Sequence, residues 1–187
     1  MRFMGKVGIV AAAALVLAGC GGSDENKASA TSTTKASVPA AAGPTVAKQK
    51  IGKECTAEDI GVEGGFGVAP TITIPDSCDP PTTLIVKDLE VGSGPAAAVG
   101  QPLEMNYTLV TWSDKKKLDS SFDRGKPFTL TLGGGQVIQG WDEGLVGVQQ
   151  GSRRLLIIPP DLGYGAGGRG IQPNETLVFV TDAVKVG

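Results

Sequence analysis

The stretch GYGAGG, residues 163–168, has the spacing G-x-G-x-x-G, which in dinucleotide-binding chains surrounds a pyrophosphate. That chemistry needs a strand before the glycines, a helix that begins at the third glycine and an acidic residue about 20 positions later. Here Pro159 and Pro160 separate the glycines from the preceding apolar run, and Pro173 and another strand-like run follow them. These flanking residues therefore predict a loop between two strands and exclude a nucleotide site.

The chain contains no histidine among its 187 residues. This excludes every histidine-dependent triad and most catalytic zinc sites. The net charge of −2 gives no indication of a nucleic-acid partner, and we expect none. We also expect no cofactor and no metal. Because the chain has no histidine, any catalysis must proceed without the usual general base.

Besides Cys20, the chain contains two cysteines, Cys55 and Cys78. They lack the C-x-x-C spacing of a redox site, and two cysteines without histidine offer too few soft ligands for a metal. In an oxidising compartment a disulfide is the expected state of such a pair, and two free buried thiols are the alternative. We therefore predict a disulfide between them.

The N-terminus has the pattern of an export signal. After a short basic start, an apolar run extends from Val7 to Ala18, which is too short to span a bilayer comfortably. The run ends in LAGC, residues 17–20, which resembles the lipobox of bacterial lipoproteins. That resemblance implies that residues 1–19 are removed and that Cys20 carries a lipid such as palmitate. The protein would then be anchored at the extracytoplasmic face of the cell membrane.

Composition divides the rest of the chain. Residues 20–50 are rich in Gly, Ser, Thr, Ala, Lys and Pro and show no apolar period, which predicts a flexible linker. Residues 51–81 form an N-terminal extension that contains the predicted disulfide, and residues 82–187 form the main domain. The sequence leaves open whether the extension caps the domain or forms a separate binding flap.

Apolar residues at a period of two predict an antiparallel sheet in this domain. In the run 103–112, Leu103, Met105, Tyr107 and Leu109 fall on one face. The other predicted strands are residues 71–74, 84–91, 127–132, 153–159 and 176–186.

One segment has a helical period instead, because Ile138, Trp141 and Leu145 recur at spacings of three and four. Gly140 and Gly144 each cost roughly 1 kcal/mol inside a helix, so this helix must be short and held by packing. The predicted fold class is α+β, an antiparallel β-sheet curled around one short α-helix.

From Leu84 to Val186 the chain resembles the FKBP-type peptidyl-prolyl cis-trans isomerases. The resemblance rests on NYTL (106–109), KLDSSFDRGKPFTLTLG (117–133), VIQGWDEGL (137–145), RRLLIIPPDLGYG (153–165) and IQPNETLVF (171–179). It implies the fold predicted above, isomerase activity on X-Pro bonds, proline-containing polypeptides as partners and macrolides as further ligands. We expect a monomer that assists the folding of exported proteins.

The resemblance also implies a site. The implied catalytic residues are Tyr107, Asp119, Trp141, Tyr164 and Phe179, and the implied substrate contacts are Leu118, Arg124, Phe128, Val137, Ile138 and Ile171. The Ile138 N–H and the Tyr164 hydroxyl are implied to meet ligand carbonyls. Without the resemblance, the aromatic residues are equally explained as core and the Asp119–Arg124 pair as an ordinary surface pair.

Rotation of an amide suits a chain without histidine, because it needs neither a nucleophile nor a proton acceptor. The barrier of about 18–20 kcal/mol reflects lost C–N resonance, and a dry aromatic pocket disfavours the planar, more polar amide relative to the twisted one. Leu118 and Leu130 stand where the family commonly has phenylalanine. They favour the alternative function, a non-catalytic peptide-binding or chaperone module that uses the same cleft.

Overall fold

The computed structural model describes residues 50–187. The predicted signal peptide, the lipidation at Cys20 and nearly all of the predicted linker lie outside the described residues. Within residues 50–187, no helix has the length and apolar character needed to cross a membrane.

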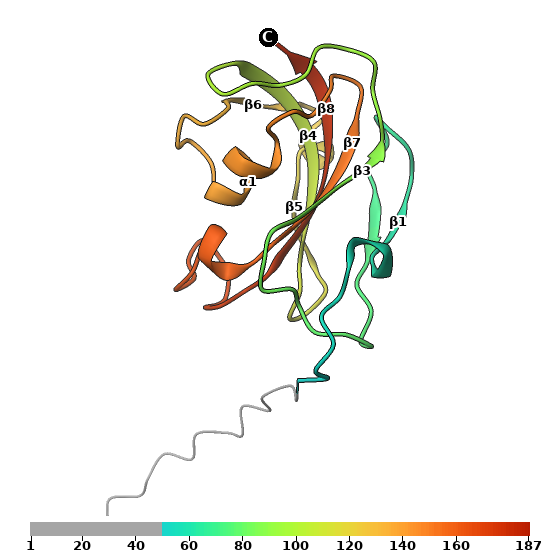
Figure 1. The fold of residues 1–187 in the computed structure, drawn as a ribbon, viewed down its shortest axis with the longest axis vertical. Coiled ribbons are helices and arrows are strands. Elements are labelled where there is room, and N and C mark those ends of the chain that lie inside the picture. The colour runs from blue at the N-terminus through green and yellow to red at the C-terminus, as the bar shows by residue number, and fades with distance from the viewer. Residues whose placement is uncertain (1–49) are drawn as a thin grey trace, which may run out of the picture. The chain divides into compact units, whose positions relative to one another are not determined.

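A six-stranded antiparallel sheet forms the body of the domain (Figure 1). Its strands are β3 (Ile85–Glu90), β4 (Pro102–Thr111), β5 (Lys117–Ser120), β6 (Phe128–Thr131), β7 (Arg153–Ile158) and β8 (Leu177–Val186). They are ordered β3-β7-β8-β4, and β5 and β6 both pair with β4. All five strands predicted in this part of the chain are confirmed, whereas β5 was not predicted, because its sequence KLDS contains a single apolar residue and shows no period.

The outer edge of β4 is shared between two short strands, and this interruption shapes the site. β5 pairs with the second half of β4, with Thr108 opposite Ser120, and β6 pairs with the first half, with Leu103 opposite Leu130. In the chain, the short 3₁₀ helix η2 (Phe122–Arg124) connects β5 to β6. At this gap Ser121 bonds both backbone groups of Tyr107, because its N–H donates to the Tyr107 carbonyl and its Oγ accepts from the Tyr107 N–H.

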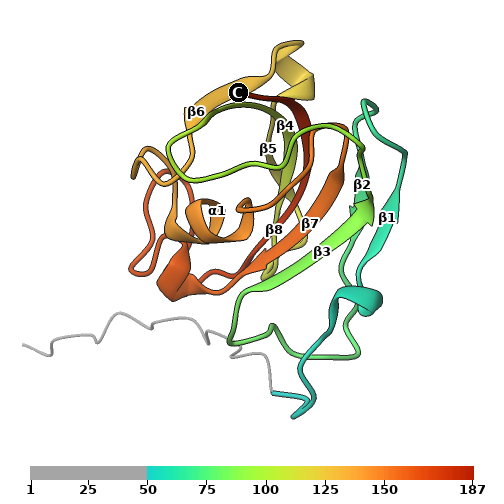
Figure 2. The ribbon, with the colours of Figure 1, turned by 45° about the horizontal axis from the view of Figure 1, so that its top comes forward.

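The helix α1 (Gln139–Gly144) packs against one face of the sheet (Figures 1 and 2). It has only six residues, because Ile138 is already extended and Leu145 already forms the C-cap. Its glycines are explained by contact: a Cβ at Gly140 would overlap Ile158 Cγ2, and one at Gly144 would lie 2.8 Å from Leu156 Cδ2. The helix can approach β7 only because these positions lack side chains.

The N-terminal extension covers the opposite face of the sheet (Figure 2). It consists of a 3₁₀ helix η1 (Ala57–Asp59) and a two-stranded sheet of β1 (Gly61–Glu63) and β2 (Thr71–Thr73). The strand predicted at residues 71–74 therefore pairs with β1, with Ile72 opposite Val62, and not with the main sheet. The extension caps the sheet, which answers the question that the sequence left open.

A disulfide between Cys55 and Cys78, with a Cα–Cα distance of 5.1 Å, closes the extension. Both cysteines are buried in a second apolar cluster with Trp112, Leu155 and Val178 of the sheet. The central strands β7 and β8 are consequently buried on both faces.

A fully buried ion pair fastens the tip of the β1–β2 hairpin to the sheet. Arg153 and Asp182 are each 1% exposed, and the Arg153 Nε donates to Asp182 Oδ1 at 2.7 Å. The remaining guanidinium nitrogens donate to the carbonyls of Gly64 and Val68, while the Gly67 N–H donates to Asp182 Oδ2. These contacts satisfy both charges, which an interior pair requires.

Candidate functional site

A cavity of about 220 Å³ opens between α1, β4 and the loop that follows β7. Its lining residues are Tyr107, Leu109, Asp119, Phe128, Gln136, Val137, Ile138, Trp141, Tyr164, Arg169 and Phe179. A larger hollow of about 340 Å³ lies over β4 and β6, but its lining contains no aromatic residue. We place the site in the smaller cavity, because it combines apolar walls with a few convergent polar groups.

Four of the five aromatic residues that line this cleft form one group of contacting rings. The Trp141 ring lies edge-on to Tyr107 and to Phe179, with centroid distances of 5.4 Å in both cases, and 6.1 Å from Phe128. Such edge-to-face geometry is the favoured arrangement of aromatic pairs. Trp141 is 3% exposed, and α1 directs it toward the sheet.

Several N–H groups at the cleft lack partners within residues 50–187, and two of them stand out. The Trp141 indole N–H is buried and has no hydrogen-bond partner among the described residues. At the N-terminus of α1, the extended backbone of Ile138 leaves its own N–H without an acceptor within residues 50–187. A buried donor without a partner costs about 1–3 kcal/mol of stability. The unpartnered donors beside the cleft are therefore consistent with a ligand that supplies an acceptor.

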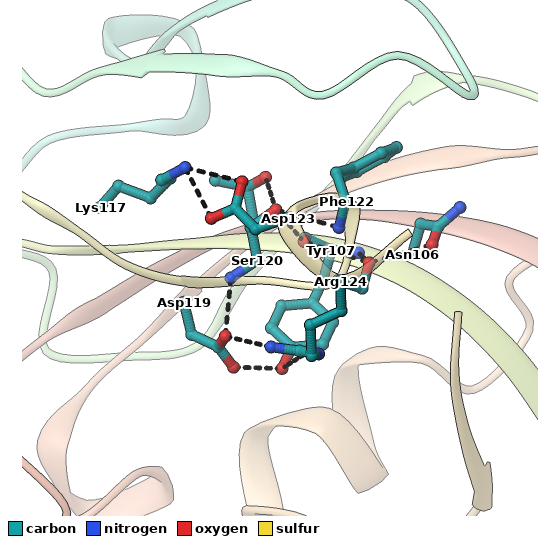
Figure 3. A network of polar contacts seen from close by, with 10 residues as sticks. Asn106, Tyr107, Lys117, Asp119, Ser120, Phe122, Asp123 and Arg124 are labelled. Carbon is teal, nitrogen blue, oxygen red and sulfur yellow. Dashed lines mark hydrogen bonds and ion pairs between the residues drawn. The ribbon is translucent and has the colours of Figure 1, made fainter. Parts of the chain in front are cut away.

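A polar network forms one wall of the cleft (Figure 3). The Tyr107 hydroxyl donates to Asp119 Oδ2, and Arg124 donates to Asp119 Oδ1 and, at 2.8 Å, to the Tyr107 hydroxyl oxygen. The Ser120 N–H also donates to Asp119, at 2.8 Å. The guanidinium lies 5.5 Å from the centroid of the Tyr107 ring, within range of a cation–π contact.

The network keeps its members in fixed protonation states. Burial and the bond to Asp119 raise the pKa of Tyr107. Burial alone would raise the pKa of Asp119, but the hydrogen bonds from Tyr107 and Arg124 outweigh it and lower that pKa below its ordinary value. Hydrogen bonds to Asp119 and to Tyr107 raise the pKa of Arg124. At neutral pH the network is a neutral phenol, a carboxylate and a guanidinium.

The loop that contains GYGAGG closes another side of the cleft. The Gly165 N–H donates to the carbonyl of Pro160, and the Asn174 N–H donates to the carbonyl of Gly165, which closes the base of the loop. Gly167 has a φ of 90°, and a Cβ there would lie 2.8 Å from the carbonyl oxygen of Ile171. This packing holds Tyr164 half-buried against the core, and its hydroxyl has no hydrogen-bond partner among the described residues.

The structure brings most of the predicted site residues together. Those that line the cleft are Tyr107, Asp119, Phe128, Val137, Ile138, Trp141, Tyr164 and Phe179. Arg124 reaches the cleft through Asp119 and Tyr107. Leu118 is 40% exposed and Ile171 is buried in the core, and neither lines the cavity. Their roles in substrate binding stay predictions.

Three lining residues, Leu109, Gln136 and Arg169, were not predicted. Leu109 could have been found, because it shares the face of β4 that carries Tyr107. Gln136 and Arg169 lie in loops, where no period in the sequence indicates the direction of a side chain.

One group of potential metal ligands comes together within residues 50–187, formed by Cys55, Asp59 and Cys78. Because its two sulfur atoms are joined in the disulfide, they cannot serve as thiolate ligands. The cleft itself contains a single carboxylate, which is already bound by Arg124 and Tyr107.

Comparisons with known proteins converge on one family. Residues 94–183 match the family model described as FKBP-type peptidyl-prolyl cis-trans isomerase. An FK506-binding protein of Streptomyces anulatus is 46% identical over 120 residues, which are 63% of this chain and 96% of that protein. An FK506-binding protein of Neisseria meningitidis serogroup A is 47% identical over 107 residues, or 56% of this chain and 96% of that protein.

Solved structures show the same likeness. AtFKBP13 superposes with a TM-score of 0.53 at 36% identity, over 57% of this chain and 95% of that structure. FkpA from Escherichia coli superposes with a TM-score of 0.52 at 40% identity, over 56% of this chain and 48% of that structure.

Proposed function

The chain belongs to the FKBP-type peptidyl-prolyl cis-trans isomerases and is an enzyme of that type, and we propose that it isomerises X-Pro bonds of exported proteins in the cleft around Trp141. The observation that carries this proposal is the cleft itself. Its aromatic walls and its unpartnered donors suit a reaction that needs desolvation and orientation and no proton transfer.

The chemistry follows from the barrier to amide rotation. The planar amide is stabilised by resonance and by water, and both are lost as the C–N bond twists. In a cleft lined by five aromatic residues the planar form loses its hydration, while the twisted form, which is less polar, loses less. The difference lowers the barrier, because only interactions that favour the transition state over the ground state accelerate a reaction.

The polar groups orient the peptide in this proposal. The Ile138 N–H and the Tyr164 hydroxyl supply donors for peptide carbonyls, since neither has an acceptor among the described residues. Asp119 and Arg124 fix the Tyr107 ring as a wall of the pocket and donate nothing to the substrate in the reaction. Asp119 therefore acts as a positioning residue.

The proposed cellular role is extracytoplasmic. It rests on the lipobox-like LAGC sequence at residues 17–20, and the Cys55–Cys78 disulfide supports it because disulfides persist in oxidising compartments. In this proposal Cys20 is lipidated and holds the isomerase, as a monomer, at the outer face of the cell membrane. Metabolic labelling with palmitate in wild-type and C20A cells tests the anchor, and an unlabelled wild-type protein contradicts it.

Isomerisation is tested by NMR exchange on an X-Pro tetrapeptide, with and without the macrolide FK506. We expect the protein to accelerate the exchange and FK506 to abolish the acceleration, because relatives that are 46% and 47% identical are FK506-binding proteins. W141A should lose most of the acceleration, and its fold is checked by the dispersion of its amide resonances. A folded W141A with unchanged turnover would place the site elsewhere.

The alternative function, a non-catalytic peptide-binding or chaperone module, drew its support from Leu118 and Leu130. Leu130 is buried in the core and Leu118 lies outside the lining, and the cleft has five aromatic lining residues without them. The same exchange measurement separates the two functions, because a non-catalytic module would bind the peptide without accelerating its exchange.

A further inference from the structure

Arg169 occupies the tip of the loop that closes the cleft. Gly168 and Ile171 exchange two backbone hydrogen bonds of 3.0 Å, so Arg169 and Gly170 are the two central residues of a hairpin turn. Their φ angles are 55° and 83°, and a positive φ at both positions is the property of a type I′ turn. Asn-Gly is the favoured sequence for that turn, whereas an arginine is unfavourable in the left-handed region.

The arginine therefore stands where its own backbone is strained. Residues in sparsely populated backbone regions cluster at functional sites, and an observed outlier is a reason to look for a function. Its neighbours Gly167, Gly168 and Gly170 also have positive φ angles. Arg169 is consequently the one position in residues 167–170 from which a side chain reaches the cleft.

The charge of Arg169 is not balanced by the protein. Two charged side chains line the cleft, Asp119 and Arg169. Asp119 is paired with Arg124, whereas Arg169 forms no hydrogen bond or ion pair within residues 50–187. The cleft wall thus presents one uncompensated positive charge, although the net charge of the chain is −2.

We propose that Arg169 makes the enzyme prefer X-Pro bonds flanked by an aspartate or a glutamate. The proposal rests on the isomerase function proposed above and names a substrate class for it. A guanidinium binds carboxylates through two parallel donors, and the Arg169 side chain is exposed, so a carboxylate of a bound peptide can reach it. An ion pair of this exposed kind corresponds to about a two- to five-fold preference.

The test uses the full-length protein and peptides with blocked, uncharged ends. In two series, the residue before or after the proline is Glu, Gln or Lys, and kcat/KM is measured by NMR exchange. At low salt we expect the Glu peptide of at least one series to exceed its Gln counterpart by about two- to five-fold, with Lys below Gln. The preference should approach one near 1 M salt, where the Debye length is about 3 Å.

Four variants assign the preference to the side chain. R169Q should abolish it, R169K should retain part of it, and R169E should transfer it to the Lys peptides. K185Q is the matched control, because Lys185 is an exposed cation on β8 that lies outside the cleft lining. K185Q should keep the full preference.

Equal rates for Glu and Gln peptides at both positions in the wild-type protein would overturn the proposal, as would a preference that persists in R169Q. Peptide dissociation constants from NMR titration give the same ratios without turnover, so a variant with little activity still decides the question. If the wild-type protein accelerates no peptide, the proposed function fails, and the ratio of dissociation constants still tests the preference separately.

Discussion

At the scale of single residues, the site is built from groups that do not titrate near neutral pH. Tyr107 stays protonated because its pKa is raised, and Asp119 stays ionised because its pKa is lowered. Arg124 holds both through hydrogen bonds. This arrangement positions an aromatic wall and transfers no proton, as expected for a chain without histidine.

The network predicts a flat pH profile. Between about pH 5 and pH 9 none of its three groups changes charge, so the NMR exchange rate catalysed by the protein should be constant. Activity should fall only in acid, as Asp119 protonates below its ordinary pKa. The stability of the protein should fall over the same acidic range as its activity. A carboxylate whose pKa is lowered in the folded state stabilises the protein above its unfolded pKa, and this stabilisation is lost as the pH falls through the folded pKa.

Replacing Asp119 tests the origin of that acid limb. D119N cannot ionise, so it should be less active at pH 7, where Tyr107 loses its charged acceptor, and its profile should lack the Asp119 step. A midpoint between about pH 6 and pH 8 in the wild-type profile would contradict this account, because no group of the network titrates there.

At the scale of elements, the sequence predicted what is local and missed what depends on a neighbour. The period of two in 103–112 predicted the face of β4 that carries Tyr107 and Leu109, and this face is confirmed. β1 was missed because Gly61–Glu63 contains a single apolar residue and therefore shows no period. Arg169 was missed because a hairpin turn inside a glycine-rich loop is defined by contacts and not by hydrophobic pattern.

The contact between α1 and β7 makes Gly140 a sensitive position. G140A gains about 1 kcal/mol of helix propensity, but its methyl group overlaps Ile158, and overpacking costs typically 1–3 kcal/mol. We therefore expect lower stability, together with reduced activity, because the adjacent Trp141 must move. Urea unfolding and the exchange assay measure the two effects.

A double-mutant cycle separates the overlap from a general sensitivity of the helix. I158A removes the side-chain atoms that the new methyl group would meet. The G140A/I158A protein should then be more stable than the sum of the two single effects predicts. Additive effects would show that the glycine is needed for another reason.

The turn at Arg169 predicts a conflict between stability and specificity. Asparagine tolerates the left-handed region, in which arginine is strained by about 1–2 kcal/mol. R169N should therefore raise the melting temperature by roughly 2–8 °C and at the same time lose the proposed preference for acidic peptides. R169K has the same backbone strain and should melt with the wild type. Equal melting temperatures of R169N and R169K would contradict the claim that the backbone is strained at residue 169.

At the scale of the described domain, one sheet serves two separate apolar clusters. Leu156 and Ile158 of β7 point to the cluster that contains Trp141, whereas Leu155 and Ile157 point to the cluster that contains the disulfide. The catalytic cleft and the N-terminal extension therefore lie on opposite faces of the same strands. This separation predicts that the disulfide contributes to stability and leaves the cleft unchanged.

Removing the disulfide tests this separation. The cysteines are 23 residues apart, and opening such a loop lowers the free energy of unfolding by about 3 kcal/mol in the chain-entropy model. C55A/C78A should lose this amount and show a larger urea m-value, because its unfolded chain is more expanded. I60V, a packing change in the same cluster, should lose stability with an unchanged m-value.

At 25 °C the exchange rate of folded C55A/C78A should equal that of the wild type, and a lower rate would mean that the extension supports the cleft through the sheet.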